Sequence, residues 1–307
     1  MGAASLLPRE VIGDWARRLF PGWYAGYVER SRLEQRQRID RLLRAAGTPT
    51  LLPASRFDEL QARRFPRAAE YRYDDFSSVV RAGERLRRLA ALLPGLTEQR
   101  SILEVSCGDG MVGALLQLGG HEVQLGDMRD WRGAAASNVP FVTWDVGDPF
   151  PQPGRRFDLV LAYNATEHWP DPEAAITALM GLCKPGGHVV LDFGPLFNSP
   201  WGLHAWSVAF PYPQFLFPRD FVEERVAALG VQDLGETYGT LQPTNGWSLE
   251  RFRALWPRLP AEVVALHEDR DYRYLDFVEQ YAGCFGGRGL SLDEITVNSI
   301  EIVLRVR

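Results

Sequence analysis

The feature that most constrains the fold of this chain is a strand-like segment that runs directly into a glycine loop. Ile102–Val105 is apolar, and Gly108, Gly110 and Gly113 follow it in the spacing G-x-G-x-x-G. After a helix-like run, a second strand-like segment ends at Asp127, 19 residues beyond Gly108. Such a loop lets backbone approach a ligand closely, and an acid at this distance binds ribose hydroxyls. The pattern predicts a nucleotide-type cofactor site; the alternative is a tight turn between a strand and a helix.

Segments further along the chain indicate which cofactor this site binds. Three residues separate Glu104 from Gly108, the first glycine of the pattern, and Phe157–Asn164 reads as another apolar strand. Asn164–Pro172 contains Glu-His-Trp-Pro-Asp-Pro, and Leu182–Leu191 contains Lys-Pro-Gly-Gly before an apolar run. Together these motifs resemble the class I S-adenosylmethionine-dependent methyltransferases, nearest to the small-molecule, quinone-biosynthesis-type members. The resemblance is strong over Ser101–Phe193 and loose in the flanks.

The resemblance implies S-adenosylmethionine as cofactor and S-adenosylhomocysteine as its product. Glu104 would orient the methionine amine and Asp127 would bind the ribose. Asp145 and Val146 would contact the adenine, and Met128 would pack on its ring. An acid about 4 Å from the positive end of this cofactor interacts with it by roughly 4 kcal/mol at an effective dielectric near 20. The whole cofactor-contacting set implied by the resemblance is Glu104, Ser106, Gly108, Gly110, Asp127, Met128, Asp145, Val146 and Asn164.

Two other classes of protein share the glycine fingerprint. An NAD-dependent oxidoreductase or epimerase has the same strand, loop and acid, but the turn Lys184–Gly187 has no rationale in an NAD site. A catalytically idle cofactor-binding partner protein would keep the cofactor motifs and have its acceptor crevice closed. The motifs favour an active methyltransferase.

The fold class expected is α/β, with a doubly wound, seven-stranded, mostly parallel sheet and helices on both faces. Helices are expected at Met111–Leu118 and Glu173–Leu182. Alternation of apolar and charged residues over Ile300–Val306 predicts a half-exposed last strand. Val263–Leu266 is its expected antiparallel partner, and Val231–Leu234 is the alternative. The other strands are expected at Ile102–Val105, Glu122–Leu125, Phe141–Trp144, Leu159–Ala162 and His188–Phe193.

Two domains are expected, a helical N-terminal extension over residues 1–97 and a methyltransferase domain over residues 98–307. In the extension, one helix from Glu29 to Ala46 would bury Ile39, Leu42, Leu43 and Ala46. A second helix from Ser78 to Leu93 would bury Val79, Gly83, Leu86, Ala90 and Leu93, and Pro94-Gly95 would stop it. These helices would cover the cofactor or shape the acceptor pocket, or else form a dimer surface, so a homodimer is left open.

An aromatic insertion over residues 194–247 follows the fifth expected strand. In open α/β sheets the ligand crevice lies at the carboxyl ends of the strands, so this insertion starts where the methyl acceptor should bind. Trp201, Trp206 and Tyr212 are the expected acceptor-contacting residues. The alternative is that the aromatic residues form a packed lid or a second small core.

A hydroxyl acceptor benefits from a general base, which gives about 10²–10⁴-fold. His168 and His204 are the candidates, because histidine titrates near neutral pH. Glu167 and Asp192 are secondary candidates. No metal is expected, because no second acid follows Glu167 at helical spacing and no group of Cys or His has zinc spacing. The function expected is O-methylation of a small molecule in specialised or cofactor metabolism, with N-methylation as the nearest alternative.

Composition excludes several other classes. The net charge of −5 and the absence of a basic stripe interleaved with aromatics argue against nucleic acid as a partner. No apolar run reaches about 18 residues, so no membrane span is expected. The three cysteines are far apart in the sequence, which is typical of reduced thiols, and the expected location is cytoplasmic.

Overall fold

A computed structural model describes residues 21–63, 65–66, 74–233, 236–238 and 241–307. Contacts divide the described chain into two units. The first joins the residues up to Thr50 with Arg273–Leu292, and the second holds Leu51–Tyr272 and Asp293–Arg307. This division does not coincide with the boundary expected at residue 97, so a separate domain over residues 1–97 stays a prediction. Every residue expected at the site lies in the second unit.

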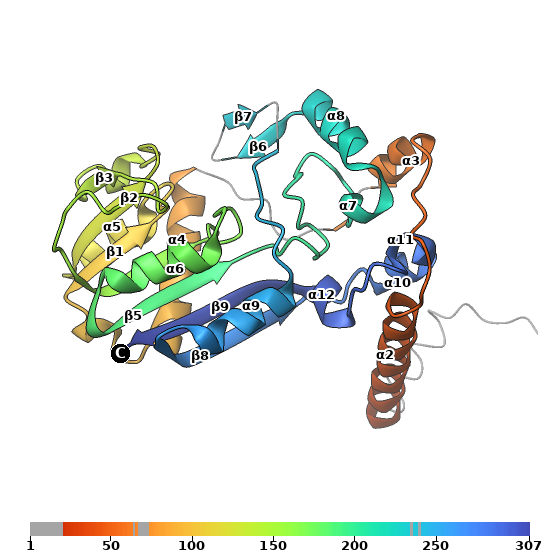
Figure 1. The fold of residues 1–307 in the computed structure, drawn as a ribbon, viewed down its shortest axis with the longest axis horizontal. Coiled ribbons are helices and arrows are strands. Elements are labelled where there is room, and N and C mark those ends of the chain that lie inside the picture. Colours follow the sequence, from red (N-terminus) through yellow and green to blue (C-terminus); the bar gives the residue numbers. More distant parts are fainter. Residues whose placement is uncertain (1–20, 64, 67–73, 234–235, 239–240) are drawn as a thin grey trace, which may run out of the picture. The chain divides into compact units, whose positions relative to one another are not determined.

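The second unit is built on a seven-stranded sheet in the order β3-β2-β1-β4-β5-β9-β8 (Figure 1). All neighbouring pairs are parallel except those that involve β9, which runs antiparallel to both β5 and β8. This topology confirms the doubly wound, mostly parallel sheet. The strands are β1 (Ser101–Val105), β2 (Glu122–Asp127), β3 (Phe141–Thr143), β4 (Phe157–Tyr163), β5 (Cys183–Phe193), β8 (Ala261–Arg270) and β9 (Val297–Val306).

The last strand has the partner expected first. Val263 of β8 is in register with Leu304 of β9, so the pairing of Val263–Leu266 with the C-terminal strand is confirmed. The alternative partner was wrong, because β6 (Val231–Asp233) pairs instead with β7 (Glu236–Tyr238) in a separate two-stranded sheet. Leu234 lies outside the described residues.

Helices cover both faces of the sheet, as expected for strands buried on both sides. Successive residues of β4 pack on opposite faces of the sheet: Val160 lies in one apolar cluster with α6 and α9, and Leu161 lies in another with α4 and α5. The remaining helices follow β5 or flank the sheet. The helices of this unit are α3 (Ser55–Arg63), α4 (Asp75–Leu92), α5 (Met111–Leu118), α6 (Pro172–Gly181), α7 (Pro213–Leu216), α8 (Arg219–Leu229), α9 (Leu249–Leu255) and α12 (Leu292–Thr296), with 3₁₀ turns η1 (Leu96–Glu98), η2 (Ala134–Ala136) and η3 (Trp256–Arg258).

Helix α4 buries only part of the face expected for it. Leu93 is buried and Leu86 packs against the core, whereas Val79, Gly83 and Ala90 are exposed. The helix also buries Ser78, Ala82 and Leu89. The reason is a polar attachment: Ser78 Oγ donates to Asp109 Oδ2 at 2.7 Å, and Arg81 pairs with the same carboxylate. An apolar pattern could not reveal a helix face that packs partly through a serine and an arginine.

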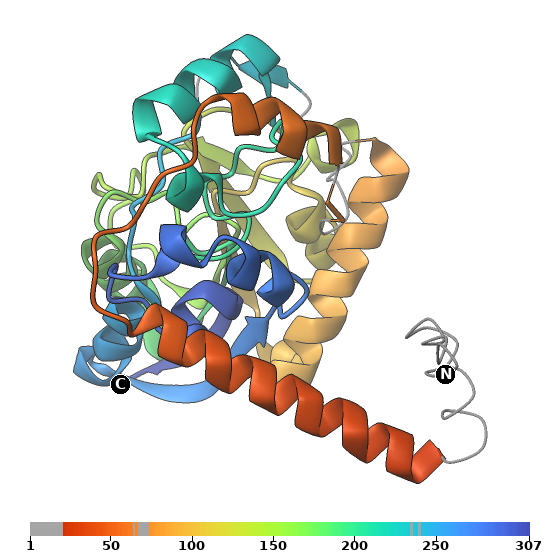
Figure 2. The same ribbon diagram turned by 90° about the vertical axis from the view of Figure 1, so that its right-hand side faces the viewer.

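The first unit contains the long helix α2 (Pro21–Leu43), drawn in red in Figure 2, with α10 (Leu275–Gln280) and α11 (Ala282–Phe285). Arg38 Nε donates to Glu279 Oε1 at 2.9 Å and links α2 to α10. Ile39 and Leu43 are buried, in agreement with the expected apolar face, but Ala46 is exposed beyond the end of the helix. Among the described residues, no helix combines the length and the apolar character that a membrane crossing needs.

Candidate functional site

The glycine loop between β1 and α5 has the backbone conformation that a ligand-binding loop needs. Ser106, Gly108 and Gly110 have positive φ angles of 52°, 53° and 68°. The left-handed region favours glycine, so the two glycines are the natural residues there. The loop places the amino end of α5 next to the carboxyl end of β1, where a ligand can approach the loop backbone closely.

Gly113 allows α5 to lie close against the sheet. Its amide donates to Glu104 Oε2 at 2.7 Å. A Cβ at this position would lie 2.9 Å from the same oxygen and would also collide with Leu125. The third glycine of the pattern is therefore required by packing between helix and strand.

Gly113→Ala is expected to destabilise the fold by about 1–3 kcal/mol, the usual range for overpacking a buried site. Chemical denaturation measures this loss. Gly83→Ala is the matched control, because a Cβ at exposed Gly83 in α4 would meet nothing within 4 Å. Alanine there should stabilise the helix by up to about 1 kcal/mol. Equal effects of the two substitutions would contradict the packing role of Gly113.

Glu104 lies at the base of the loop and is only 2% exposed. Burial raises the pKa of Glu104 to about 8, and the nearby charge of Arg85 opposes this rise. Arg85, on α4, has its guanidinium carbon 4.7 Å from the centre of the Tyr163 ring. A carboxyl group and a guanidinium group are thus both close to the carboxyl ends of β1 and β4.

Asp127 ends β2 with its carboxylate held by the loop. Oδ2 accepts from the amide of Gly108 at 3.0 Å, and Oδ1 accepts from the amide of Met128 at 2.8 Å. Burial raises the pKa of Asp127 above its ordinary value, and these amides oppose the rise. The Met128 side chain is 68% exposed, so it is available to cover a ring.

The residues expected around adenine follow β3. The amide of Trp144 donates to the carbonyl of Asp127 at 2.8 Å, which brings the ends of β2 and β3 together. Asp145 is exposed and its Oδ1 accepts from the amide of Gly147 at 2.9 Å, while Val146 is buried. The structure therefore brings Asp127, Asp145 and the glycine loop to one edge of the sheet.

Cys107 lies in the loop but has no catalytic surroundings. It is buried and free, like Cys183 and Cys284, and burial raises the pKa of its thiol above the ordinary range. A thiol with a raised pKa is a poor nucleophile. This favours a packing role for Cys107.

The loop after β4 begins at Asn164, whose φ is 49° and whose amide donates to the carbonyl of Asp192 at 2.7 Å. Asn245, which sequence reasoning missed, holds this loop in place by hydrogen bonds. Its amide donates to the carbonyl of Glu167 at 2.9 Å, and its Nδ2 donates to that of Thr166 at 2.8 Å. Nothing in the local sequence connects residue 245 to a loop about 80 residues earlier.

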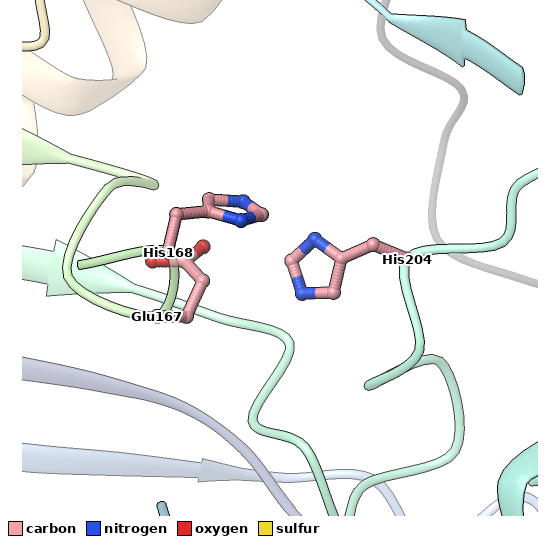
Figure 3. Close-up of side chains that lie close together, drawn as sticks. All are labelled: Glu167, His168 and His204. Atoms are coloured by element: carbon pink, nitrogen blue, oxygen red, sulfur yellow. The ribbon is translucent and has the colours of Figure 1, made fainter. Parts of the chain in front are cut away.

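The side chains of Glu167, His168 and His204 meet beyond the ends of β4 and β5, as Figure 3 shows. The imidazole rings lie nearly perpendicular, with centroids 4.7 Å apart. His168 Nδ1 lies 2.9 Å from the carbonyl oxygen of Pro243, and His204 Nε2 lies 2.9 Å from that of Pro195. Burial lowers the pKa of His204 to about 3, so its ring is neutral at neutral pH.

Glu167 supplies the carboxylate of this group, and it is 3% exposed. Its Oε1 accepts from the amide of Gly194 at 3.1 Å, whereas Oε2 has no hydrogen-bond partner among the described residues. Burial raises the pKa of Glu167 to about 8. Asp192, the other secondary candidate, is partly buried on β5, and burial also raises its pKa.

The three aromatic residues expected at the acceptor differ in their surroundings. Trp206 is partly exposed, and its ring centre lies 5.8 Å from that of His204. Trp201 is buried. Tyr212 is completely buried and its hydroxyl donates to the carbonyl of Ile295 at 2.8 Å, which favours a packing role. Trp206 therefore remains the strongest of the three acceptor candidates.

Much of the aromatic insertion forms a small core of its own. Phe210 and Phe217 both pack edge-on against Phe57 of α3, at centroid distances of 5.2 and 5.5 Å. All three are buried. This arrangement agrees with the alternative expectation of a second core, and it supports the segment that carries His204.

The fold and this edge of the sheet define the class of protein, a Rossmann-like enzyme of the adenosylmethionine-binding type. A model of the methyltransferase domain family matches residues 71–233, slightly more than half of the chain. The chain therefore belongs to the class I S-adenosylmethionine-dependent methyltransferases, and the expected family and cofactor are confirmed.

Two proteins of similar sequence agree with this family. A "Ubiquinone biosynthesis O-methyltransferase" of Cereibacter sphaeroides is 32% identical over 205 residues, which cover 57% of this chain and 77% of that protein. A protein of the same name from Alkalilimnicola ehrlichii is 35% identical over 124 residues, or 38% of this chain and 49% of its own length. The chain thus spans about half the length of this second relative. A crystal structure of the N-methyltransferase NodS from Bradyrhizobium japonicum with S-adenosyl-L-homocysteine is 15% identical, with a TM-score of 0.39, covering 81% of this chain and 97% of that one.

Proposed function

We propose that this protein transfers a methyl group from S-adenosylmethionine to a hydroxyl group of a small molecule. The observation that carries the proposal is the cluster of Glu167, His168 and His204 beyond β4 and β5, at the carboxyl edge of the sheet that also carries the cofactor motifs. An ionised oxygen is a much better nucleophile than a hydroxyl, so polar groups at this place serve O-methylation directly.

The bound cofactor supplies an electrophilic methyl group on a sulfonium centre. Asp127 fits the ribose, because its carboxylate accepts from loop amides, those of Gly108 and Met128 among them, and has lone pairs left for hydroxyl groups. Glu104 and Arg85 fit the two charged ends of an amino acid, the carboxyl group facing the ammonium and the guanidinium facing the carboxylate. Asp145 and Val146 remain the proposed adenine contacts.

Arg85→Ala is expected to weaken S-adenosylmethionine binding about tenfold, because one charge-assisted contact to the cofactor is lost in a partly exposed position. Isothermal titration calorimetry measures this change. Arg87→Ala is the control, because Arg87 is exposed on the same helix. If both variants bind the cofactor as tightly as the parent protein, Arg85 does not contact it.

The hydroxyl group of the methyl acceptor needs a base that takes its proton. A carbonyl oxygen only accepts hydrogen bonds, so His168 holds its proton on Nδ1, toward Pro243, and carries its lone pair on Nε2. His204 is held in the same way through Nε2 toward Pro195, with its lone pair on Nδ1. The low pKa of His204 makes it a weak proton acceptor, so His168 is the stronger candidate base.

The names of the relatives agree with a hydroxyl acceptor, since both describe O-methylation. A free amine attacks the methyl group without a base, so an amine acceptor would leave this cluster without a chemical role. The NAD-dependent alternative is set aside by the family. The alternative of a catalytically idle cofactor-binding partner protein stays a prediction. The homodimer also stays a prediction, and mass photometry checks it.

The proposal is tested by incubating the full chain with S-adenosylmethionine and two matched panels, one of phenols and catechols and one of primary and secondary amines. S-adenosylhomocysteine formation and a mass increase of one methylene unit report transfer. Methylation of phenols above the amine panel is expected. Methylation of amines alone would assign N-methylation, and cofactor binding without turnover on either panel would favour an idle partner protein.

A further inference from the structure

Three side chains with metal-binding atoms converge from two separate loops. Glu167 and His168 follow β4, and His204 follows β5. One ligand atom from each lies within 4.8 Å of the others. Figure 3 shows the two histidine side chains pointing toward each other, with the carboxylate of Glu167 beneath His168.

Both histidines are held in the manner typical of metal ligands. Such histidines usually donate their second ring N–H to a carbonyl or carboxylate, which fixes the tautomer and turns the lone pair of the other nitrogen toward the metal. Here His168 uses Nδ1 toward Pro243 and His204 uses Nε2 toward Pro195, each at 2.9 Å. Each carbonyl thus holds the proton on the ring nitrogen that faces it, and the other nitrogen of each neutral ring carries a lone pair.

Glu167 provides a second and independent observation. It is 3% exposed, and its Oε2 has no hydrogen-bond partner among the described residues. The Oγ1 of Thr166 beside it is also buried without a partner in the described part of the chain. A buried carboxylate oxygen without a partner is costly, and a cation is the group that would remove this cost.

We propose that Glu167, His168 and His204 form a binding site for one divalent transition-metal ion, with Zn²⁺ the best match to two imidazoles and a carboxylate. Ligand atoms about 2.1 Å from a tetrahedral zinc ion lie about 3.4 Å apart, so atoms that lie up to 4.8 Å apart without the ion need to approach one another by at most about 1.4 Å when it binds.

The role of this ion rests on the proposed function. Three protein ligands leave at least one coordination position open, as in catalytic zinc sites. A hydroxyl group that occupies it has a lowered pKa and gives its proton to solvent while the oxygen keeps the bonding electron pair. Two neutral imidazoles and one carboxylate give the site a net charge of +1 with the metal, which one ionised hydroxyl neutralises.

The experiment uses the full chain without a histidine tag, dialysed against a chelator and titrated with Co²⁺, whose visible absorption reports tetrahedral nitrogen and oxygen ligands. One Co²⁺ per chain is expected, displaced by Zn²⁺. Glu167→Gln keeps the shape of the side chain and should weaken binding at least about 100-fold. His168→Ala, at a partly exposed position, is the second variant. His267→Ala, exposed on β8, is the control.

Thermal unfolding and S-adenosylmethionine affinity check that each variant is folded. No saturable Co²⁺ binding, or equal binding by Glu167→Gln, His168→Ala and the parent chain, would overturn the metal site. Full methyl transfer by metal-free protein would overturn the proposed role of the ion in the reaction and leave the proposed function standing. One bound ion with no acceptor methylated would support the site and count against the proposed function.

Discussion

Replacing His168 with alanine is expected to lower the rate of methyl transfer about 10²–10⁴-fold and to leave S-adenosylmethionine affinity nearly unchanged. The reason is position: His168 lies beyond β4, on the side proposed for the acceptor, whereas the described contacts of the cofactor motifs are made around Gly108 and Asp127. Either role of the ring, as a base or as a metal ligand, predicts a loss in kcat. Steady-state kinetics and calorimetry on the same preparations separate the two quantities.

The control is His267→Ala, because His267 is exposed on β8 and pairs only with Asp269 among the contacts described for it. His204→Ala should also lower kcat, but His204 is buried, so its effect counts only where thermal unfolding shows an intact fold. Full turnover by both His168→Ala and His204→Ala would mean that the acceptor arrives already ionised or is a free amine.

The cofactor half of the site could be predicted from the sequence because its residues lie near each other in the chain. Glycines and an acid at fixed spacing after a strand specify one loop geometry, and the contact from the amide of Gly108 to Asp127 is the physical result. The strands were also predictable, since a parallel sheet buried on both faces needs continuous apolar runs. The pairing of Val263 with the last strand followed from alternation.

The acceptor half could be predicted only as separate candidates. Glu167, His168 and His204 were each identified, but their convergence depends on where two loops of different strands end. Spacing rules therefore predicted no metal, since they consider one helix or one short motif at a time. Arg85 and Asn245 were missed for the same reason: each contacts residues far away in the sequence.

Tyr212 illustrates the opposite difficulty, because an aromatic side chain suits a binding pocket and a core equally well. Its side chain is completely buried. Its hydroxyl donates to the carbonyl of Ile295 in α12, a helix some 80 residues further along the chain. The hydroxyl of a buried tyrosine needs a hydrogen-bond partner. Only the folded chain shows that this partner is a backbone carbonyl and not the substrate that would receive the methyl group.

The second large effect is expected for Asp127→Ala, which should weaken S-adenosylmethionine binding about 100-fold. Two hydrogen bonds from ribose hydroxyls to an ionised carboxylate contribute about 1.5 kcal/mol each, and about 3 kcal/mol corresponds to roughly this factor. The substitution also leaves the amides of Gly108 and Met128 without their acceptor. A loss of folding stability of about 1–3 kcal/mol should therefore accompany the loss of affinity.

These two consequences of Asp127→Ala can be separated, because Asp127→Asn keeps the size of the side chain and one carbonyl oxygen. The asparagine amide group can accept from only one of the two loop amides, so this variant should recover part of the stability and less of the affinity. Asp148→Ala, at an exposed position close to the same loops, is the control for a general charge effect. If Asp127→Ala binds the cofactor as tightly as the parent protein while the loop remains folded, the ribose does not lie at the end of β2, and the cofactor orientation inferred from the three strand ends is wrong.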